Sequence, residues 1–121
     1  IQRQAELVHK NHTKVKKRLE DETEFQLKEK FTIIREYKKG DKLKPHLDNA
    51  APFAITIVVK KSDDKENPLV FYNEDSTDII ILKEGDGYYF KGMEIPHERL
   101  EVQSEYLLHI YLGYGYTNKL I

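Results

Sequence analysis

The sequence of 121 residues contains no cysteine. Disulfide bridges, thiolate catalysis and cysteine-bound zinc or iron–sulfur sites are therefore excluded, and any metal must be held by histidine and carboxylate. A charge excess of either sign is also lacking, because 20 Lys+Arg against 21 Asp+Glu leave a formal net charge of −1. No strong field therefore draws this protein toward nucleic acid or an anionic membrane.

Long apolar runs are missing as well. No stretch approaches the roughly 20 apolar residues of a membrane span, and the first residues lack the apolar core of a signal peptide. We therefore expect a soluble protein, located in the cytoplasm. The sequence begins with isoleucine, as we expect of a trimmed chain.

The chain length fits a single domain over residues 1–121. Residues 1–30 contain neither glycine nor proline and carry dense mixed charge. Four residues in this segment fall at roughly helical intervals: Val8, His12, Val15 and Leu19. The spacing predicts an amphipathic helix over about residues 1–30 that packs on a sheet.

From Phe31 onward the pattern changes to short segments rich in β-branched residues and tyrosine, separated by turn residues. The expected strands are FTIIREY, PFAITIVVKK, LVFYNE, TDIIILK, GYYFKG and EYLLHIYLGY, and the final GYTNKLI is interpreted as a tail. This order favours a mostly β fold with an N-terminal helix. Its core, over about residues 31–114, is expected to be a double-stranded β-helix, the jelly-roll or cupin-like architecture.

Three polar residues suggest a metal site. His46 and Asp48 are two residues apart before an alternating apolar segment, so on a strand they point to one face. His97 comes from near the end of a distant predicted strand, which a jelly roll can bring alongside. Two histidines and one carboxylate form the facial triad that binds non-haem Fe(II) and leaves positions open. Taken alone, His46 and Asp48 also fit a surface histidine beside a capping aspartate.

The motifs around these residues strengthen the metal interpretation. The chain reads YKKGDKLKPHLDN before an alternating strand, then LVFY, then LKEGDGYYFKGMEIPHE. In order and spacing, these motifs resemble the 2-oxoglutarate- and Fe(II)-dependent oxygenase superfamily, particularly its prolyl-hydroxylase-like branch. The resemblance runs from about Phe31 to Tyr114.

The resemblance implies an enzyme, a non-haem Fe(II)/2-oxoglutarate-dependent dioxygenase whose iron ligands are His46, Asp48 and His97. It implies Fe(II) and 2-oxoglutarate as cofactors, ascorbate as a reductant, and hydroxylation of a substrate with release of succinate and CO₂. Asp48 argues against the halogenases of the superfamily, which lack this carboxylate. The sequence does not indicate whether the substrate is a peptide or a small molecule, nor does it indicate an oligomeric state.

The sequence departs from the superfamily pattern at the residue that anchors the distal carboxylate of 2-oxoglutarate. An arginine or lysine is expected on the last core strand, but that window reads SEYLL, with Tyr106 at the nominal place. A buried carboxylate needs a charge-assisted partner. The candidates are Arg99 and Tyr37, ranked equally, followed by His109 and Tyr106. The plainer interpretations are a solvated arginine, a core-edge tyrosine and a hydrogen-bonded core histidine.

Two other classes of protein stay open. The missing cation favours a cupin-like metal-binding protein without 2-oxoglutarate turnover. A metal-free β-sandwich interaction module, which binds for example sugars through its tyrosines, fits the aromatic C-terminal half. These tyrosines either line a substrate groove or pack within the sheet: Tyr88, Tyr89, Tyr111, Tyr114 and Tyr116.

Overall fold

The computed structural model describes residues 13–22 and 25–119. Residues 13–22 are helical, and within the described range eight strands follow. Within the same residues, no helix has both the length and the apolar composition that a bilayer crossing requires. The strands are β1 (Phe25–Lys38), β2 (Leu43–His46), β3 (Phe53–Lys61), β4 (Leu69–Tyr72), β5 (Thr77–Ile80), β6 (Gly87–Phe90), β7 (His97–Arg99) and β8 (Tyr106–Lys119).

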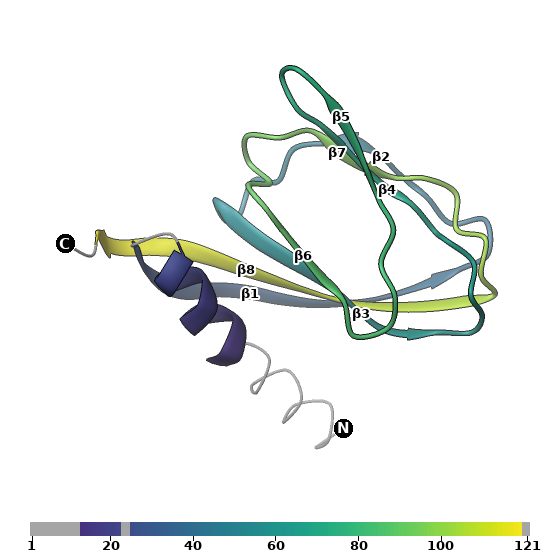
Figure 1. Ribbon diagram of the computed structural model, residues 1–121, viewed down its shortest axis with the longest axis horizontal. Helices are drawn as coiled ribbons and strands as arrows, with labels where there is room; N and C mark the ends of the chain where they lie inside the picture. Colours follow the sequence, from purple (N-terminus) through teal and green to yellow (C-terminus); the bar gives the residue numbers. More distant parts are fainter. Residues whose placement is uncertain (1–12, 23–24, 120–121) are drawn as a thin grey trace.

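The strands form two four-stranded sheets that face each other (Figure 1). The order β1-β8-β3-β6 makes the sheet that we call the major sheet, and β2-β7-β4-β5 makes the minor sheet. All strand pairs are antiparallel. Because the chain crosses repeatedly from one sheet to the other, the architecture is a double-stranded β-helix. The predicted fold class, mostly β with an N-terminal helix, is confirmed.

The major sheet has an apolar face toward the helix and a more polar face toward the minor sheet. On β8, Ile110, Leu112 and Tyr114 belong to the buried cluster that includes Leu19 of the helix. The alternate residues of β8 point to the opposite face, as the two-residue period of a strand requires. One of them, His109, is buried between the sheets. The interior therefore receives polar side chains from β8.

The first strand begins earlier than the sequence suggested. We expected a helix to about residue 30, but β1 begins at Phe25 and the described helix ends by residue 22. Leu27 is buried and pairs with Tyr116 of β8, so burial in the sheet overrides the charged, helix-like composition. The expected C-terminal tail is wrong for residues 115–119, because β8 runs to Lys119 and pairs with β1, and residues 120–121 lie outside the described residues.

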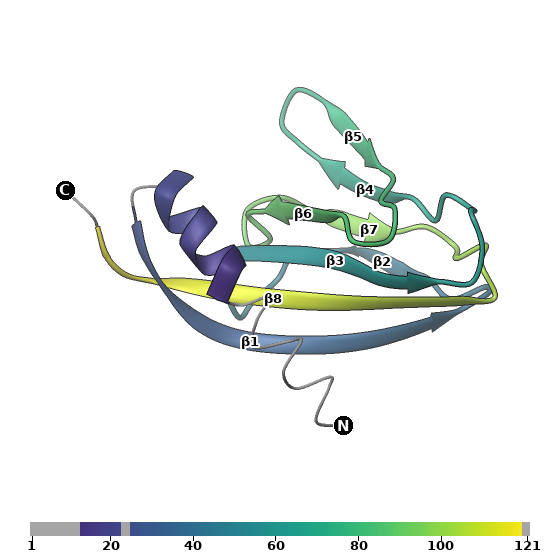
Figure 2. The same cartoon turned by 60° about the horizontal axis from the view of Figure 1, so that its bottom comes forward.

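The part of the predicted helix that is described packs as expected. Leu19 is buried and Val15 packs against the same cluster, on the outer face of the major sheet. Figure 2 shows the helix beside this sheet, next to β8 and close to the start of β1. Val8 and His12 of the predicted stripe lie outside the described residues.

Candidate metal and dicarboxylate site

His46, Asp48 and His97 meet at one end of the space between the sheets. His46 is the last residue of β2 and pairs with His97, the first residue of β7. Asp48 lies two residues beyond β2, in a loop, rather than on a strand as expected. The ligand atoms of all three residues lie within 4.8 Å of one another. The structure therefore brings together the three residues that the sequence selected.

The distances suit one ion. Asp48 Oδ1 lies 3.3 Å from His97 Nε2 and 3.8 Å from His46 Nε2. An octahedral ion with bonds of about 2.1 Å holds adjacent ligand atoms about 3 Å apart, so small side-chain shifts would complete the coordination. The three groups occupy one side of such an ion and leave the other side open.

The two imidazoles are already oriented for metal binding. Nδ1 of His46 lies 2.7 Å from the Lys44 carbonyl oxygen, and Nδ1 of His97 lies 2.8 Å from the Ile95 carbonyl oxygen. A carbonyl only accepts, so both Nδ1 atoms carry the proton and donate it. In the neutral rings, each Nε2 lone pair then points toward Asp48 and is available to a metal.

His97 sits deeper than His46. Its ring stacks on Phe71 and contacts Phe90, with centroid distances of 5.5 and 4.9 Å. Burial opposes protonation of His97, but the hydrogen bonds to Asp48 and to the Ile95 carbonyl outweigh it, so the pKa of His97 is raised above its usual value. Without a metal, Asp48 therefore favours a proton at the position where a cation would bind.

Gly92 makes room for the Asp48 carboxylate. The Asp48 amide donates to the Gly92 carbonyl oxygen at 2.8 Å, which fixes the two backbones against each other. A Cβ atom at position 92 would meet Asp48 Oδ2 and would lie 2.7 Å from Asp48 Cγ. Any larger residue at this position would displace the carboxylate from the two histidines.

A cavity of about 100 Å³ extends from these three residues into the interior. Its walls come from both sheets, and both apolar and polar side chains line it. The lining residues used below are Ile33 and Arg35 on β1, Leu43 on β2, Thr56 on β3, Phe71 on β4, Arg99 on β7 and Tyr111 on β8.

Arg99 lies on the cavity wall, two residues along β7 from His97. Its side chain is 2% exposed, so it is not the solvated arginine of the plainer interpretation. One terminal nitrogen donates to the Asn67 carbonyl oxygen and the other to His109 Nε2, each at 2.9 Å. Its Nε is buried and has no hydrogen-bond partner. Among the described residues, no carboxylate forms an ion pair with it.

His109 supports Arg99 from β8. Because the guanidinium only donates, His109 Nε2 must accept, and Nδ1 then carries the proton and donates to Thr56 Oγ1 at 2.7 Å. Burial, assisted by the positive charge of Arg99, lowers the pKa of His109 to about 3. His109 is therefore neutral at physiological pH and acts as an acceptor that orients the arginine.

Tyr37 lies behind Arg99 and not on the cavity wall. The Arg99 guanidinium carbon lies 4.8 Å from the centre of the Tyr37 ring, a cation–π contact. The hydroxyl groups of Tyr37 and Tyr111 are 2.8 Å apart. Burial and this contact raise the pKa of Tyr37 far above its usual value, so the hydroxyl stays protonated. Tyr111, the partner of Tyr37 in this pair, lines the cavity.

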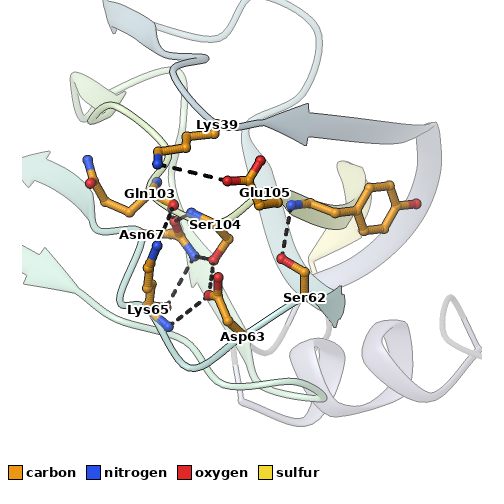
Figure 3. A network of polar contacts seen from close by, with 9 residues as sticks. Lys39, Ser62, Asp63, Lys65, Asn67, Gln103, Ser104 and Glu105 are labelled. Carbon is orange, nitrogen blue, oxygen red and sulfur yellow. Dashed lines mark hydrogen bonds and ion pairs between the residues drawn. The ribbon is translucent and has the colours of Figure 1, made fainter.

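Asn67 fixes the carbonyl oxygen that Arg99 contacts. Its φ of 47° is in the left-handed region, which asparagine tolerates better than most residues. Its side-chain oxygen accepts from the Gln103 and Ser104 amides, and its side-chain nitrogen donates to Ser104 Oγ. Ser104 Oγ in turn donates to Asp63 (Figure 3). This network joins the loops before β4 and β8.

Tyr106, the last-ranked candidate, is not part of this arrangement. Its hydroxyl donates to Glu36 at 3.2 Å in an exposed position, and it does not line the cavity. The other tyrosines divide between the two interpretations. Tyr111 lines the cavity, whereas Tyr88 contacts Phe71 and Tyr89 contacts Phe53 in sheet packing.

Sequence reasoning missed three polar residues that line the cavity, Arg35, Thr56 and Glu98, and it also missed Asn67, which supports Arg99. Thr56 occurs in the alternating segment PFAITIVVKK, where it is the one polar residue on its face with Ala54 and Val58. A threonine with apolar residues two positions to either side in a strand-like segment was a usable signal. Arg35 and Asn67 carried none, because only the sheet register places them.

The site belongs to a double-stranded β-helix protein with a convergent His–Asp–His triad. Neither a known family model nor a curated protein matches the sequence. Solved structures are similar in fold. A prolyl-4-hydroxylase from Pseudomonas putida has a TM-score of 0.63 and 16% identity, over 72% of this chain and 52% of that chain.

Two further structures have the same architecture. A 2OG-Fe(II) oxygenase family oxidoreductase from Burkholderia pseudomallei has a TM-score of 0.66 and 16% identity, over 80% of this chain and 48% of that chain. A cupin domain from Bordetella pertussis has a TM-score of 0.51 and 8% identity, over 72% of this chain and 82% of that chain. The chain thus spans about half the length of the two oxygenases. At these identities the similarity establishes the fold.

Proposed function

We propose that the protein is a non-haem Fe(II)/2-oxoglutarate-dependent dioxygenase that hydroxylates a substrate presented at the cavity mouth. One observation carries the proposal: a single small cavity has a metal-ligand triad at one end and a buried, incompletely satisfied cation, Arg99, at the other. A dicarboxylate that chelates a metal through one end requires a cationic partner at its other end.

The dimensions of the chain fit this arrangement. His97 and Arg99 point to the same face of β7, and residues two apart on a strand are separated by about 6.6 Å. A five-carbon dicarboxylate has a comparable length. The guanidinium offers five N–H donors and uses two in the contacts described, so donors are left for a ligand carboxylate.

His46, Asp48 and His97 would hold the metal, and Arg99, oriented by His109, would bind the distal carboxylate. When bound, Fe(II) and 2-oxoglutarate would supply, together with dioxygen, an oxidative decarboxylation that releases CO₂, places one oxygen atom of O₂ in succinate and inserts the other into a substrate C–H bond. Thr56 and Tyr111 offer hydroxyl groups along the cavity, and Leu43, Phe71 and their apolar neighbours exclude water from it.

The test is an anaerobic titration of the full chain with Fe(II) and then with 2-oxoglutarate. A weak visible metal-to-ligand charge-transfer band should appear only when both are present. Succinate should then form on addition of oxygen, even without a primary substrate. An Asp48→Ala variant is the control and should show neither signal.

A cupin-like metal-binding protein without 2-oxoglutarate turnover is the second candidate. The observation that favours it is that the Arg99 guanidinium already contacts His109, the Asn67 carbonyl oxygen and the Tyr37 ring within the protein. In this case the chain should bind the metal but show no charge-transfer band with 2-oxoglutarate. Absence of metal uptake would instead favour the metal-free interaction module.

A further inference from the structure

Two strands that lie at the edges of the described sheets border the cavity. Within the part of the chain that is described, β1 pairs only with β8 and β2 pairs only with β7, so each is an edge strand. Of the residues that line the cavity, only Ile33 on β1 and His46 on β2 are classed as exposed. The mouth therefore lies between these two edges. A free strand edge is a template for an added strand.

The two edge strands are cationic in a protein whose net charge is −1. β1 contains four cations and two carboxylates, and β2 contains one cation and no carboxylate, a net charge of +3. Arg35 is the cation of β1 that lines the cavity. Its guanidinium carbon lies 5.9 Å from the centre of the Tyr111 ring, and it forms no ion pair with any described carboxylate.

The cavity is too small for a large substrate. Sites that enclose drug-sized ligands have volumes of about 300–1,000 Å³, whereas this cavity has about 100 Å³. A further reactant must therefore approach from outside. Two apolar side chains close to the metal-binding residues are exposed, Leu47 at 53% and Met93 at 44%. They adjoin Asp48 and Gly92, whose backbones are hydrogen-bonded to each other.

We propose that an extended acidic polypeptide segment binds along the outer edge of β1, at the mouth between β1 and β2. In an added strand, alternate side chains face the cavity side of β1, which presents Phe31, Ile33 and Arg35 in succession. The complementary segment has apolar side chains opposite the first two and a carboxylate opposite Arg35. That this segment is the substrate rests on the proposed dioxygenase function, whereas its binding does not.

The test uses a fluorescein-labelled peptide of eight residues with valine, valine and glutamate at alternate positions and serine between them. The matched peptide has lysine in place of glutamate. Anisotropy with the Mn(II)-loaded full chain should show binding of the glutamate peptide only. Arg35→Gln should weaken this binding at least tenfold, whereas Lys60→Gln, an exposed cation on β3, should not. Amide hydrogen exchange should show protection in residues 28–36.

Ile33→Asp provides a second variant, because Ile33 is 40% exposed and can be replaced without disturbing the core. The added carboxylate should weaken binding of the glutamate peptide at least tenfold, because it repels the glutamate side chain. Equal binding of both peptides, competition by oligo-dT of the same charge, protection outside β1, or no binding of either peptide would overturn the proposal. The charge-transfer band, measured on the same protein, reports separately on the dioxygenase proposal.

Discussion

Replacing Arg99 by methionine should abolish tight binding of 2-oxoglutarate while leaving the metal site intact. Methionine retains much of the buried volume and removes the guanidinium. A ligand carboxylate at this end of the cavity would lose charge-assisted hydrogen bonds, each of about 1.5–3 kcal/mol. Since the hydroxyl groups of Thr56 and Tyr111 would remain, we expect a net loss of about 2–3 kcal/mol, or about 30- to 150-fold in affinity.

The assay is the anaerobic titration of Fe(II)-loaded protein with 2-oxoglutarate, followed by the charge-transfer band. Co(II) affinity should change by less than about threefold, because no ligand of the triad is altered. The midpoint of thermal unfolding should fall, because His109 and the Asn67 carbonyl lose their hydrogen-bond donor. The titrations should therefore be done well below that temperature. Arg35→Met is the matched control, an arginine on the same cavity wall.

Normal 2-oxoglutarate affinity in Arg99→Met would refute this reasoning. If Arg35→Met then bound 2-oxoglutarate more weakly, Arg35 would be the anchor. The proposal that Arg35 binds a polypeptide segment would then be refuted as well. If the parent protein binds metal but no 2-oxoglutarate, the dioxygenase proposal gives way to the cupin-like metal-binding protein.

Three further predictions concern the metal end and the interior. Asp48→Ala should lower Co(II) or Mn(II) affinity at least tenfold in a direct titration, and affinity equal to that of the parent would rule out the assigned triad. Gly92→Ala should also weaken Co(II) binding at least tenfold, because its Cβ displaces the Asp48 carboxylate, whereas Gly115→Ala, which meets only the mobile end of Lys30, should not. In the folded protein the pKa of His109 is about 3, whereas in the unfolded chain it is near 6.5. The neutral His109 therefore makes its full contribution to the free energy of unfolding above pH 6.5, and this contribution is lost as the pH falls below 6.5. Urea unfolding should show a loss of about 2 kcal/mol from this group between pH 7.5 and 5, which His109→Gln should abolish without changing metal affinity; an unchanged pH dependence in the variant would contradict the buried neutral histidine.

The strand pattern and the pairing of His46 with Asp48 were predictable, because both rest on short-range patterns, whereas the approach of His97 followed only from the expected jelly-roll architecture. Alternation of apolar residues in segments such as PFAITIVVKK specifies one packed face, and in β3 the residues Ile55, Ile57 and Val59 of that face pack against the cluster that contains Leu19 of the helix. The two side chains come together even though Asp48 lies in a loop, where its amide is held by the Gly92 carbonyl oxygen.

The boundary between helix and first strand was not predictable in the same way. In FQLKEK, burial of Leu27 against β8 determines the structure, and the partner strand is about 90 residues away along the chain. Nor could the relation of Arg99 to His109 be seen in the sequence. The two residues were ranked as alternative anchors, whereas the sheet register makes one the hydrogen-bond support of the other.

The burial of Arg99 bears directly on the choice between the two metal-binding functions. A buried cation without a carboxylate partner is costly, and an apolar residue at such a position is often neutral or stabilising. Here a left-handed Asn67, a neutral His109 and the Tyr37 ring all hold the cation at the inner end of the cavity. Metal binding alone requires none of these residues, because the triad lies at the other end. A ligand carboxylate would supply the missing partner, so the cost of the buried guanidinium favours the dioxygenase over a protein that binds only the metal.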